Sequence, residues 1–414
     1  MKKSFTLFSI LLTSLFSVAQ GLSDSVYLGV YYINKSYYSL SQGEVQNSPN
    51  AGWDLAFEMS GMGSSIRINA QAAARLYIYP HGDANAWNSA DTAGLHNWKP
   101  LYDADYSWHI GAFEQNLQAG NPFDLGWGSY NQITHTVQGD SVYFFKTVSG
   151  KWKKLLIEGL VNGSYNFKYE DLDGSNSVNA SISKANFAGK RFGYYSITAG
   201  ASLDLEPKIE DWDLLFTKYM IQNPSGDYET EIVALTNTNI RVAEVDGLAD
   251  PYQETAFAGL DFDTTINTIG YDWYTWLPSS GSFKVKDSLA FFLKDTASEA
   301  VYRLIMEEFG GVADGKIKFH KEQVNTVKLE DELESIQFKV YPNPANDRLN
   351  IVYDLSGKAE LSIFDSKGAI MLKKQLDNQH FSEESLSLQQ LKPGLYFVEV
   401  RLGNERVTEK LIVQ

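Results

Sequence analysis

The 414-residue chain contains no cysteine. This absence excludes disulfide bonds, zinc–thiolate sites, cysteine nucleophiles and thiolate-bound haem. It also removes the residue to which a bacterial lipoprotein attaches its lipid, so we do not expect a lipoprotein. The absence of thiols does not indicate the redox compartment, because a chain without cysteine is compatible with both oxidising and reducing compartments.

Basic residues are scarce relative to acidic ones, with 35 Lys and Arg against 51 Asp and Glu and a formal net charge of −16. A charge of this sign argues against nucleic acids and anionic membrane surfaces as partners. Long apolar runs are scarce as well. Beyond the N-terminus no stretch approaches the roughly 18 apolar residues of a membrane-spanning helix, so we expect no transmembrane segment.

Helical periodicity is rare, whereas aromatic residues make up 14% of the chain. The longer apolar runs are rich in β-branched and aromatic residues, which favour strands over helices. Short alternating segments are separated by turn signals such as Ser-Gly and Asp-Gly. The sequence therefore predicts an all-β protein.

Catalytic signatures are missing too. The chain has no HExxH, no GxSxG and no paired His–Cys arrangement. We therefore predict a protein that is not an enzyme. A secreted hydrolase, for instance a glycosidase, is the least favoured alternative, since a sequence cannot show two carboxylates facing each other.

The N-terminus has the pattern of a secretory signal peptide. Met1-Lys2-Lys3 is followed by an apolar run and then by Ser17-Val18-Ala19, with small residues at the positions that signal peptidase reads. We predict a signal peptide over residues 1–19, with cleavage between Ala19 and Gln20.

Two stretches of the chain repeat at a separation of about 150 residues. Tyr37-Tyr38-Ser39-Leu40 leads to Trp53-Asp54-Leu55, and Tyr194-Tyr195-Ser196-Ile197 leads to Trp212-Asp213-Leu214. Two later pairs of strand-like segments match in the same order. We predict two copies of one β-module, over residues 20–188 and 189–328, with Trp53 and Trp212 as core anchors.

A long insertion interrupts the first copy at about residues 81–131 and carries four tryptophans, Trp87, Trp98, Trp108 and Trp127. Loops of this length in a compact domain are functional or pack through their own side chains. Because aromatic faces stack on sugars, the insertion suggests a carbohydrate-binding or adhesion protein. After the second copy, residues 329–337 form an acidic segment that we interpret as a solvated linker.

The last part of the chain is dense in motifs. It begins with Tyr341-Pro342-Asn343-Pro344, continues with a Leu-x-Pro-Gly-x-Tyr box that includes Gly394 and Tyr396, and ends with a strand that starts at Lys410. Alternating apolar residues between Pro-Gly and Lys-Gly turns predict a small immunoglobulin-like β-sandwich over residues 338–414.

These boxes, in this order, resemble the type A C-terminal sorting domain of the type IX secretion system of Bacteroidota. The resemblance covers residues 338–414. It implies that the outer-membrane type IX machinery reads the tail and that the tail is then removed. The expected location is secreted or on the outer-membrane surface, reached through the periplasm.

The repeated module resembles the HmuY-like family of haem-binding proteins. The resemblance rests on the runs Asp211–Tyr219 and Ile269–Trp273, with the segment around Trp53 as a more diverged match. It implies two tandem twisted β-sheet or sandwich modules and names haem as a candidate cofactor. Whether haem is the ligand stays open, because the family's haem binders are typically lipoproteins.

Haem needs one or two nitrogen or sulfur donors facing an aromatic-lined slot. None of the candidates aligns with a family ligand position, so no ligand is carried over. The candidate ligands in this chain are His81, His96, His109, His135, Met59, Met62 and Met220. A surface-loop position for the histidines, and core packing for Met59 and Met62, are the alternative interpretations.

Overall fold

The computed structural model describes residues 22–118, 120–254, 256–324, 336–355, 357–377, 382–403 and 405–414. The predicted signal peptide over residues 1–19, with its Ala19–Gln20 cleavage site, lies outside the described residues. Residues 329–335 of the predicted acidic linker also lie outside the described residues. The last two residues of that linker belong to a strand instead, since β23 begins at Ile336.

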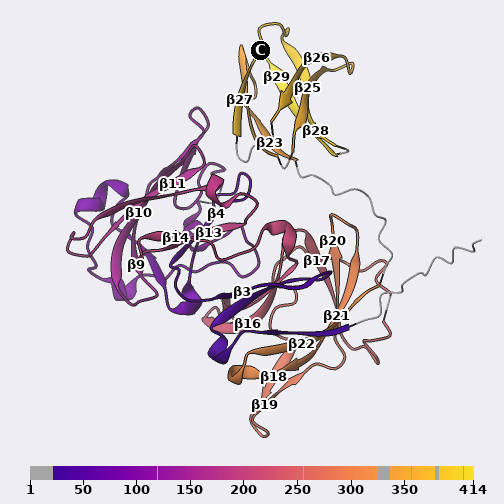
Figure 1. Ribbon diagram of the computed structural model, residues 1–414. Helices are drawn as coiled ribbons and strands as arrows, with labels where there is room; N and C mark the ends of the chain where they lie inside the picture. Colours follow the sequence, from indigo (N-terminus) through magenta and orange to yellow (C-terminus); the bar gives the residue numbers. More distant parts are fainter. Residues whose placement is uncertain are drawn as a thin grey trace, which may run out of the picture.

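The all-β prediction is confirmed, and Figure 1 shows strands throughout the described parts of the chain. The helices of the described residues are short 3₁₀ turns. They are η1 (Val30–Tyr32), η2 (Ala70–Ala72), η3 (Ala84–Asn88), η4 (Leu95–Asn97), η5 (Ala112–Asn116), η6 (Lys184–Phe187), η7 (Ile209–Asp211) and η8 (Gly311–Ala313).

Two sheets form what we call the first unit, and they enclose a core rich in aromatic residues such as Phe57, Trp127 and Phe167. The larger sheet contains β12 (Val178–Ser183), β11 (Ser164–Glu170), β10 (Trp152–Val161), β8 (Thr136–Gly139) and β7 (Gly128–Asn131), and β9 (Val142–Lys146) pairs with both β10 and β6 (Arg75–Ile78). The smaller sheet has the order β14 (Ala201–Leu203), β13 (Phe192–Ser196), β4 (Leu55–Glu58) and β5 (Ile66–Ile68).

The second unit has its own core, which includes Phe216, Trp273 and Phe319. Its five-stranded sheet has the order β1 (Leu22–Tyr27), β22 (Lys316–Gln323), β21 (Val301–Phe309), β20 (Ala290–Asp295) and β17 (Ile240–Val245). A four-stranded sheet follows the order β16 (Tyr228–Thr236), β15 (Leu214–Gln222), β2 (Asn34–Ser39) and β3 (Gly43–Pro49), and β18 (Tyr274–Leu277) pairs with β19 (Ser282–Val285).

The two units do not divide the chain at the predicted boundary between residues 188 and 189. Strand β13, from the second repeat, pairs with β4 of the first, and β2, from the first repeat, pairs with β15 of the second. The registers are equivalent, since Tyr195 lies opposite Leu55 and Tyr38 lies opposite Leu214. Each repeat therefore contributes a strand to a sheet of the other, which a repeat in sequence cannot reveal.

Matching side chains hold the two exchanged strands. Asp54 Oδ2 accepts a hydrogen bond from the backbone N–H of Ile197 at 2.8 Å, and Asp213 Oδ2 accepts one from Leu40 at 2.7 Å. Because both carboxylates are largely buried, each is a strong acceptor that fixes the end of the incoming strand.

The exchange centres on two tyrosines. The rings of Tyr37 and Trp212 lie 5.1 Å apart, those of Tyr194 and Trp53 lie 5.0 Å apart, and both pairs are edge-on. The hydroxyls of Tyr37 and Tyr194 are 3.2 Å from each other. Both tryptophans are at least 95% buried, as expected for core anchors.

The tail folds as a separate small sandwich with its own core. One sheet contains β23 (Ile336–Tyr341), β24 (Arg348–Leu355) and β27 (Ser382–Ser387). The other contains β26 (Ile370–Leu376), β25 (Ala359–Asp365), β28 (Gly394–Leu402) and β29 (Glu405–Val413). Inward side chains alternate along these strands, as the sequence pattern predicted.

Candidate functional site

The insertion of the first repeat packs on the first unit through three of its tryptophans. Trp87, Trp108 and Trp127 are buried, with Trp127 fully so, whereas Trp98 is partly exposed. The indole N–H of Trp108 donates to the carbonyl of Thr236 at 2.8 Å and thereby ties the insertion to the second unit. Most of the tryptophans are therefore structural, and Trp98 is the exception.

One buried ion pair fixes the middle of the insertion. Arg67 on β5 lies 3.7 Å from Asp103 and donates to the carbonyls of Ala104, Ser107 and Trp108. Burial raises the pKa of Asp103 to about 6, although the nearby Arg67 opposes that change. A guanidinium with several backbone acceptors holds an irregular segment that has no sheet partners of its own.

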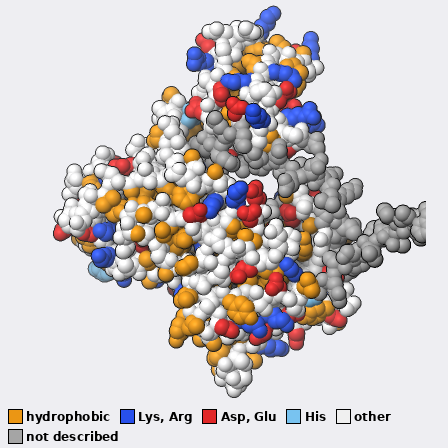
Figure 2. Space-filling view, viewed as in Figure 1, with side chains coloured by type: hydrophobic (Ala, Val, Ile, Leu, Met, Phe, Trp, Pro, Cys, Tyr) orange, Lys and Arg blue, Asp and Glu red, His pale blue; other side chains and the backbone are white. Residues whose placement is uncertain are grey.

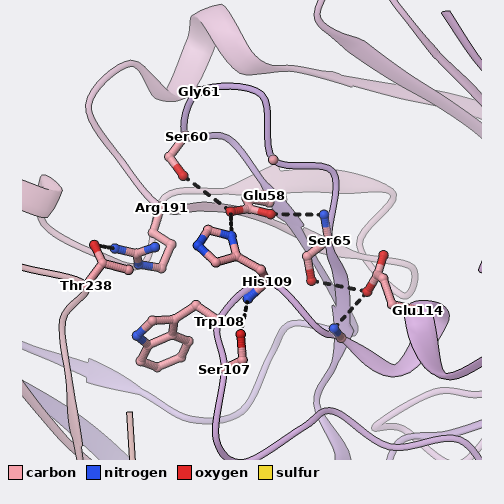
Figure 3. A network of polar contacts seen from close by, with 12 residues as sticks. Glu58, Ser60, Gly61, Ser65, Ser107, Trp108, His109, Glu114, Arg191 and Thr238 are labelled. Carbon is pink, nitrogen blue, oxygen red and sulfur yellow. Dashed lines mark hydrogen bonds and ion pairs between the residues drawn. The ribbon is translucent and has the colours of Figure 1, made fainter. Parts of the chain in front are cut away.

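A second polar network holds the same segment against β4 and β5 (Figure 3). Glu58 accepts a hydrogen bond from His109 Nδ1 at 2.7 Å. Glu114 accepts from the backbone N–H groups of Gly111 and Ile66 at 2.7 and 3.1 Å. Burial alone would raise the pKa of Glu58, but its hydrogen bond with His109 and the nearby charges lower it; burial raises the pKa of Glu114 well above its ordinary value.

A glycine allows this close approach. A Cβ atom on Gly111 would lie 2.2 Å from the carbonyl oxygen of Ile66, so the start of η5 can rest against β5 only with glycine there. The insertion is thus held rigidly on one side. Its other side borders a cleft.

The cleft has a volume of about 400 Å³ and lies between the insertion and β16. Its walls carry both aromatic rings and side-chain amides. They are formed by Ile78, Pro80, Asn97, Trp98, Lys99, Pro100, Leu101, Tyr102, Gln115, Asn116 and Tyr228. Lys99 is the one formally charged residue among these lining residues.

The aromatic walls are fixed by ring contacts. The rings of Tyr102 and Tyr228 pack at a tilt of 31° with their centroids 4.2 Å apart, so the insertion and the second unit meet at this point. Trp98 packs against Phe144 at 5.6 Å and Tyr79 at 5.8 Å. Because these contacts already fix the rings, little side-chain conformational entropy is lost when a ligand binds to their apolar faces.

The polar walls are formed by exposed amides. Asn97, Gln115 and Asn116 all reach the surface, and each amide can donate and accept hydrogen bonds. A shallow site with aromatic faces and neutral amides suits a ligand that has both apolar faces and many hydroxyl groups.

The predicted haem ligands are mostly dispersed. His109 is bound to Glu58, His81 lies beside Tyr79 and Trp98, and His96 is exposed on η4. Met59 and Met220 are at least 94% buried and belong to the first core.

Met62 and His135 come closer together. Both line a cavity of about 350 Å³ with Tyr130 and with Tyr341 of the tail. His135 Nδ1 is engaged with the Tyr130 hydroxyl at 2.7 Å, and burial lowers the pKa of His135. Within the described residues, no group of three or more His, Asp or Glu side chains could hold a metal ion.

The motif residues of the tail meet in space. Asn343 Nδ2 donates to the carbonyl of Lys410, and Asn343 Oδ1 accepts from the N–H of Ile412 at 2.9 Å. Tyr341–Pro342 and Asn343–Pro344 are both cis peptide bonds. In the Pro-Gly box that contains Gly394, the hydroxyl of Tyr396 donates to the carbonyl of Lys392 at 2.8 Å.

Residues 339–414 match the family described as the secretion system C-terminal sorting domain. The tail is a type IX sorting domain. The protein is accordingly exported by the type IX system, to the cell surface or beyond it. The family match does not extend into the repeated region, and no curated protein matches the chain.

One similar solved structure is that of dimeric latent PorU from Porphyromonas gingivalis. Its identity to this chain is 10%, with 84% of this chain and 34% of PorU covered and a TM-score of 0.18. This chain thus spans about a third of PorU, and a TM-score this low does not establish a shared fold. Among the described residues, no helix has the length and apolar character needed to cross a membrane.

Several residues of the cleft were not singled out from the sequence. Tyr102, Gln115 and Asn116 lie within the insertion, whose composition was noted as a whole. Tyr228 lies more than a hundred residues downstream, at the start of β16, and no local pattern connects it with the insertion. The run Asn97-Trp98-Lys99, in which polar residues flank a tryptophan, is a local signal that could have pointed to this site.

Proposed function

We propose that this protein is an exported carbohydrate-binding protein of the cell surface or surroundings and that the cleft beside Trp98 is its binding site. The observation that carries the proposal is the pairing of braced aromatic rings with exposed neutral amides. The C–H faces of a sugar ring pack on aromatic rings, while its hydroxyls exchange hydrogen bonds with amides. We propose binding rather than catalysis, because the residues that line the cleft include no Asp, Glu or His. Their titratable side chains are those of Lys99, Tyr102 and Tyr228.

The mature full-length protein would be tested on a glycan array, followed by calorimetry with the best glycan. Trp98→Ala should lower the affinity about fivefold or more, since one stacked ring contributes on the order of 1 kcal/mol or more. Trp276→Ala, which changes an exposed tryptophan on β18 in the second unit, is the matched control and should change nothing. Absence of glycan binding, or equal losses in both variants, would refute the proposal.

Haem, the ligand suggested by the HmuY-like resemblance, has less support. Met62 and His135 share a cavity, but the tail forms part of its wall, and the other candidate ligands lie elsewhere. Hemin added to the mature protein gives a direct comparison. A Soret shift that disappears in His135→Ala would favour haem over carbohydrate.

A further inference from the structure

A second aromatic surface lies next to the cleft, on the far side of Trp98. The ring of His81 is 6.4 Å from that of Trp98 and 5.6 Å from that of Tyr79, and both contacts are edge-on. His81 is exposed and Tyr79 is partly exposed. Between these two residues lies Pro80, which already lines the cleft, so the two surfaces are continuous.

The segment that carries this surface is held in place at both ends. The N–H of Tyr79 donates to the carbonyl of Val142 at 2.8 Å, and the N–H of Ala84 donates to Asp140 at 2.7 Å. Asp83 caps η3 by accepting from the N–H of Asn85 at 2.9 Å. Rings on such a segment are pre-organised for contact with a ligand.

The layer beneath this surface is apolar. Tyr79 and Trp98 pack on a cluster that includes Trp87, Phe144 and Leu156, on the outer side of β9 and β10. Figure 2 shows hydrophobic side chains gathered over the lobe in which Figure 1 labels these two strands. The buried cluster therefore supports the partly exposed rings of Tyr79 and Trp98 from beneath.

We propose that the cleft and this neighbouring surface together bind an oligosaccharide of several units, with Tyr79 and His81 forming a second subsite. The inference rests on the proposed carbohydrate binding and adds chain length to it. One sugar unit occupies the cleft between Trp98 and Tyr228. The next units run over the exposed edge of Trp98 toward His81.

Matched disaccharides and tetrasaccharides of the cello-, xylo- and manno-oligosaccharide series would be titrated into the mature protein by calorimetry. In the series that binds, the tetrasaccharide should bind at least about fivefold more tightly than the disaccharide. His81→Ala should lower tetrasaccharide affinity roughly three- to tenfold, as expected for one lost aromatic contact, and should leave disaccharide affinity unchanged. Tyr79→Leu also removes a ring that braces Trp98, so it should lower the affinity for both lengths, with the larger loss for the tetrasaccharide.

The outcomes separate this inference from the proposed function. Equal affinity for both lengths, or equal losses for both lengths in His81→Ala, would overturn the second subsite, while Trp98→Ala would still weaken binding. If no saccharide of either length binds, both the subsite and the carbohydrate proposal are wrong. Leucine at position 79 keeps the apolar packing, so a folded variant is expected for the test.

Discussion

The two repeats build the same scaffold, but they differ in what they add to it. Both place a Tyr-Tyr-Ser strand beside the Trp-Asp strand of the other copy, and both secure it with a buried aspartate, Asp54 or Asp213. Only the first carries the insertion that forms the wall of the cleft. The comparison indicates that the repeated residues provide the frame, while the insertion provides most of the proposed binding site.

The two repeats differ at one buried position of their exchanged strands. In the alignment of the exchanged strands Lys35 corresponds to Phe192, so one copy buries an ammonium group where the other buries a ring. Lys35 Nζ donates to the Tyr194 hydroxyl at 3.0 Å and lies 4.3 Å from the ring centroid of that tyrosine. The buried charge of Lys35 therefore distinguishes one of the two exchanged strands from the other.

The largest effect is expected from deletion of residues 22–49, which removes β1, β2 and β3. Although these strands come from the first repeat, their loss should unfold the second unit, because β15 and β22 would lose their partners. Circular dichroism and proteolysis of the variant measure this. A variant lacking the β18–β19 hairpin is the control, and an intact second unit after deletion of residues 22–49 would contradict the exchange.

Trp53→Ala and Trp212→Ala should each lower the free energy of unfolding by about 3–5 kcal/mol, since both remove a buried indole from equivalent sites. Urea denaturation should give one cooperative transition for both variants. Trp276→Ala, at an exposed position, should change the free energy by less than about 0.5 kcal/mol. Two separate transitions would mean that the units fold independently.

Lys35 should make stability depend on pH. Burial lowers the pKa of Lys35 to about 8, so between pH 8 and 10.5 the unfolded chain holds a proton that the native state has lost. The free energy of unfolding, relative to that of Lys35→Met, should therefore rise by up to about 3 kcal/mol from pH 7 to 10.5. Denaturation across this range measures the difference.

Phe192→Met is the matched control for that titration, because the equivalent position carries no ionisable group. Its difference from the unmodified protein should be constant with pH. A constant difference for Lys35→Met as well would show that the ammonium group is solvated in the native state.

A small stability effect is expected at the proposed binding site. Trp98→Ala removes a partly exposed ring and should cost less than about 1 kcal/mol in thermal or urea unfolding, while it weakens glycan binding. A loss comparable to that of Trp53→Ala would instead place Trp98 in the framework.

The sequence predicted the all-β class and the tail well, because strand alternation and the proline and glycine boxes act over short distances. Trp53 and Trp212 were correctly predicted as core anchors, since they occupy equivalent positions just before a strand in the two copies. The partners of those strands could not be predicted. From sequence alone, each of the two similar strands could pair with either neighbouring strand. Which pairing forms depends on packing across the whole molecule.

The cleft was predicted only in outline. The aromatic composition pointed to the insertion, but three of its four tryptophans turned out to be buried. Tyr228 enters the site because β16 lies beside the insertion in space, where the ring of Tyr228 packs against that of Tyr102. A contact between segments so far apart in sequence has no local signature.

Hydrogen–deuterium exchange with and without the bound oligosaccharide tests the central claim most directly. The account predicts added protection in residues 95–102, 115–118 and 226–230, which border the cleft, and none in the β18–β19 hairpin of the second unit. Protection that is confined to the second unit, or that is spread equally over both repeats, would contradict the assignment of function to the insertion.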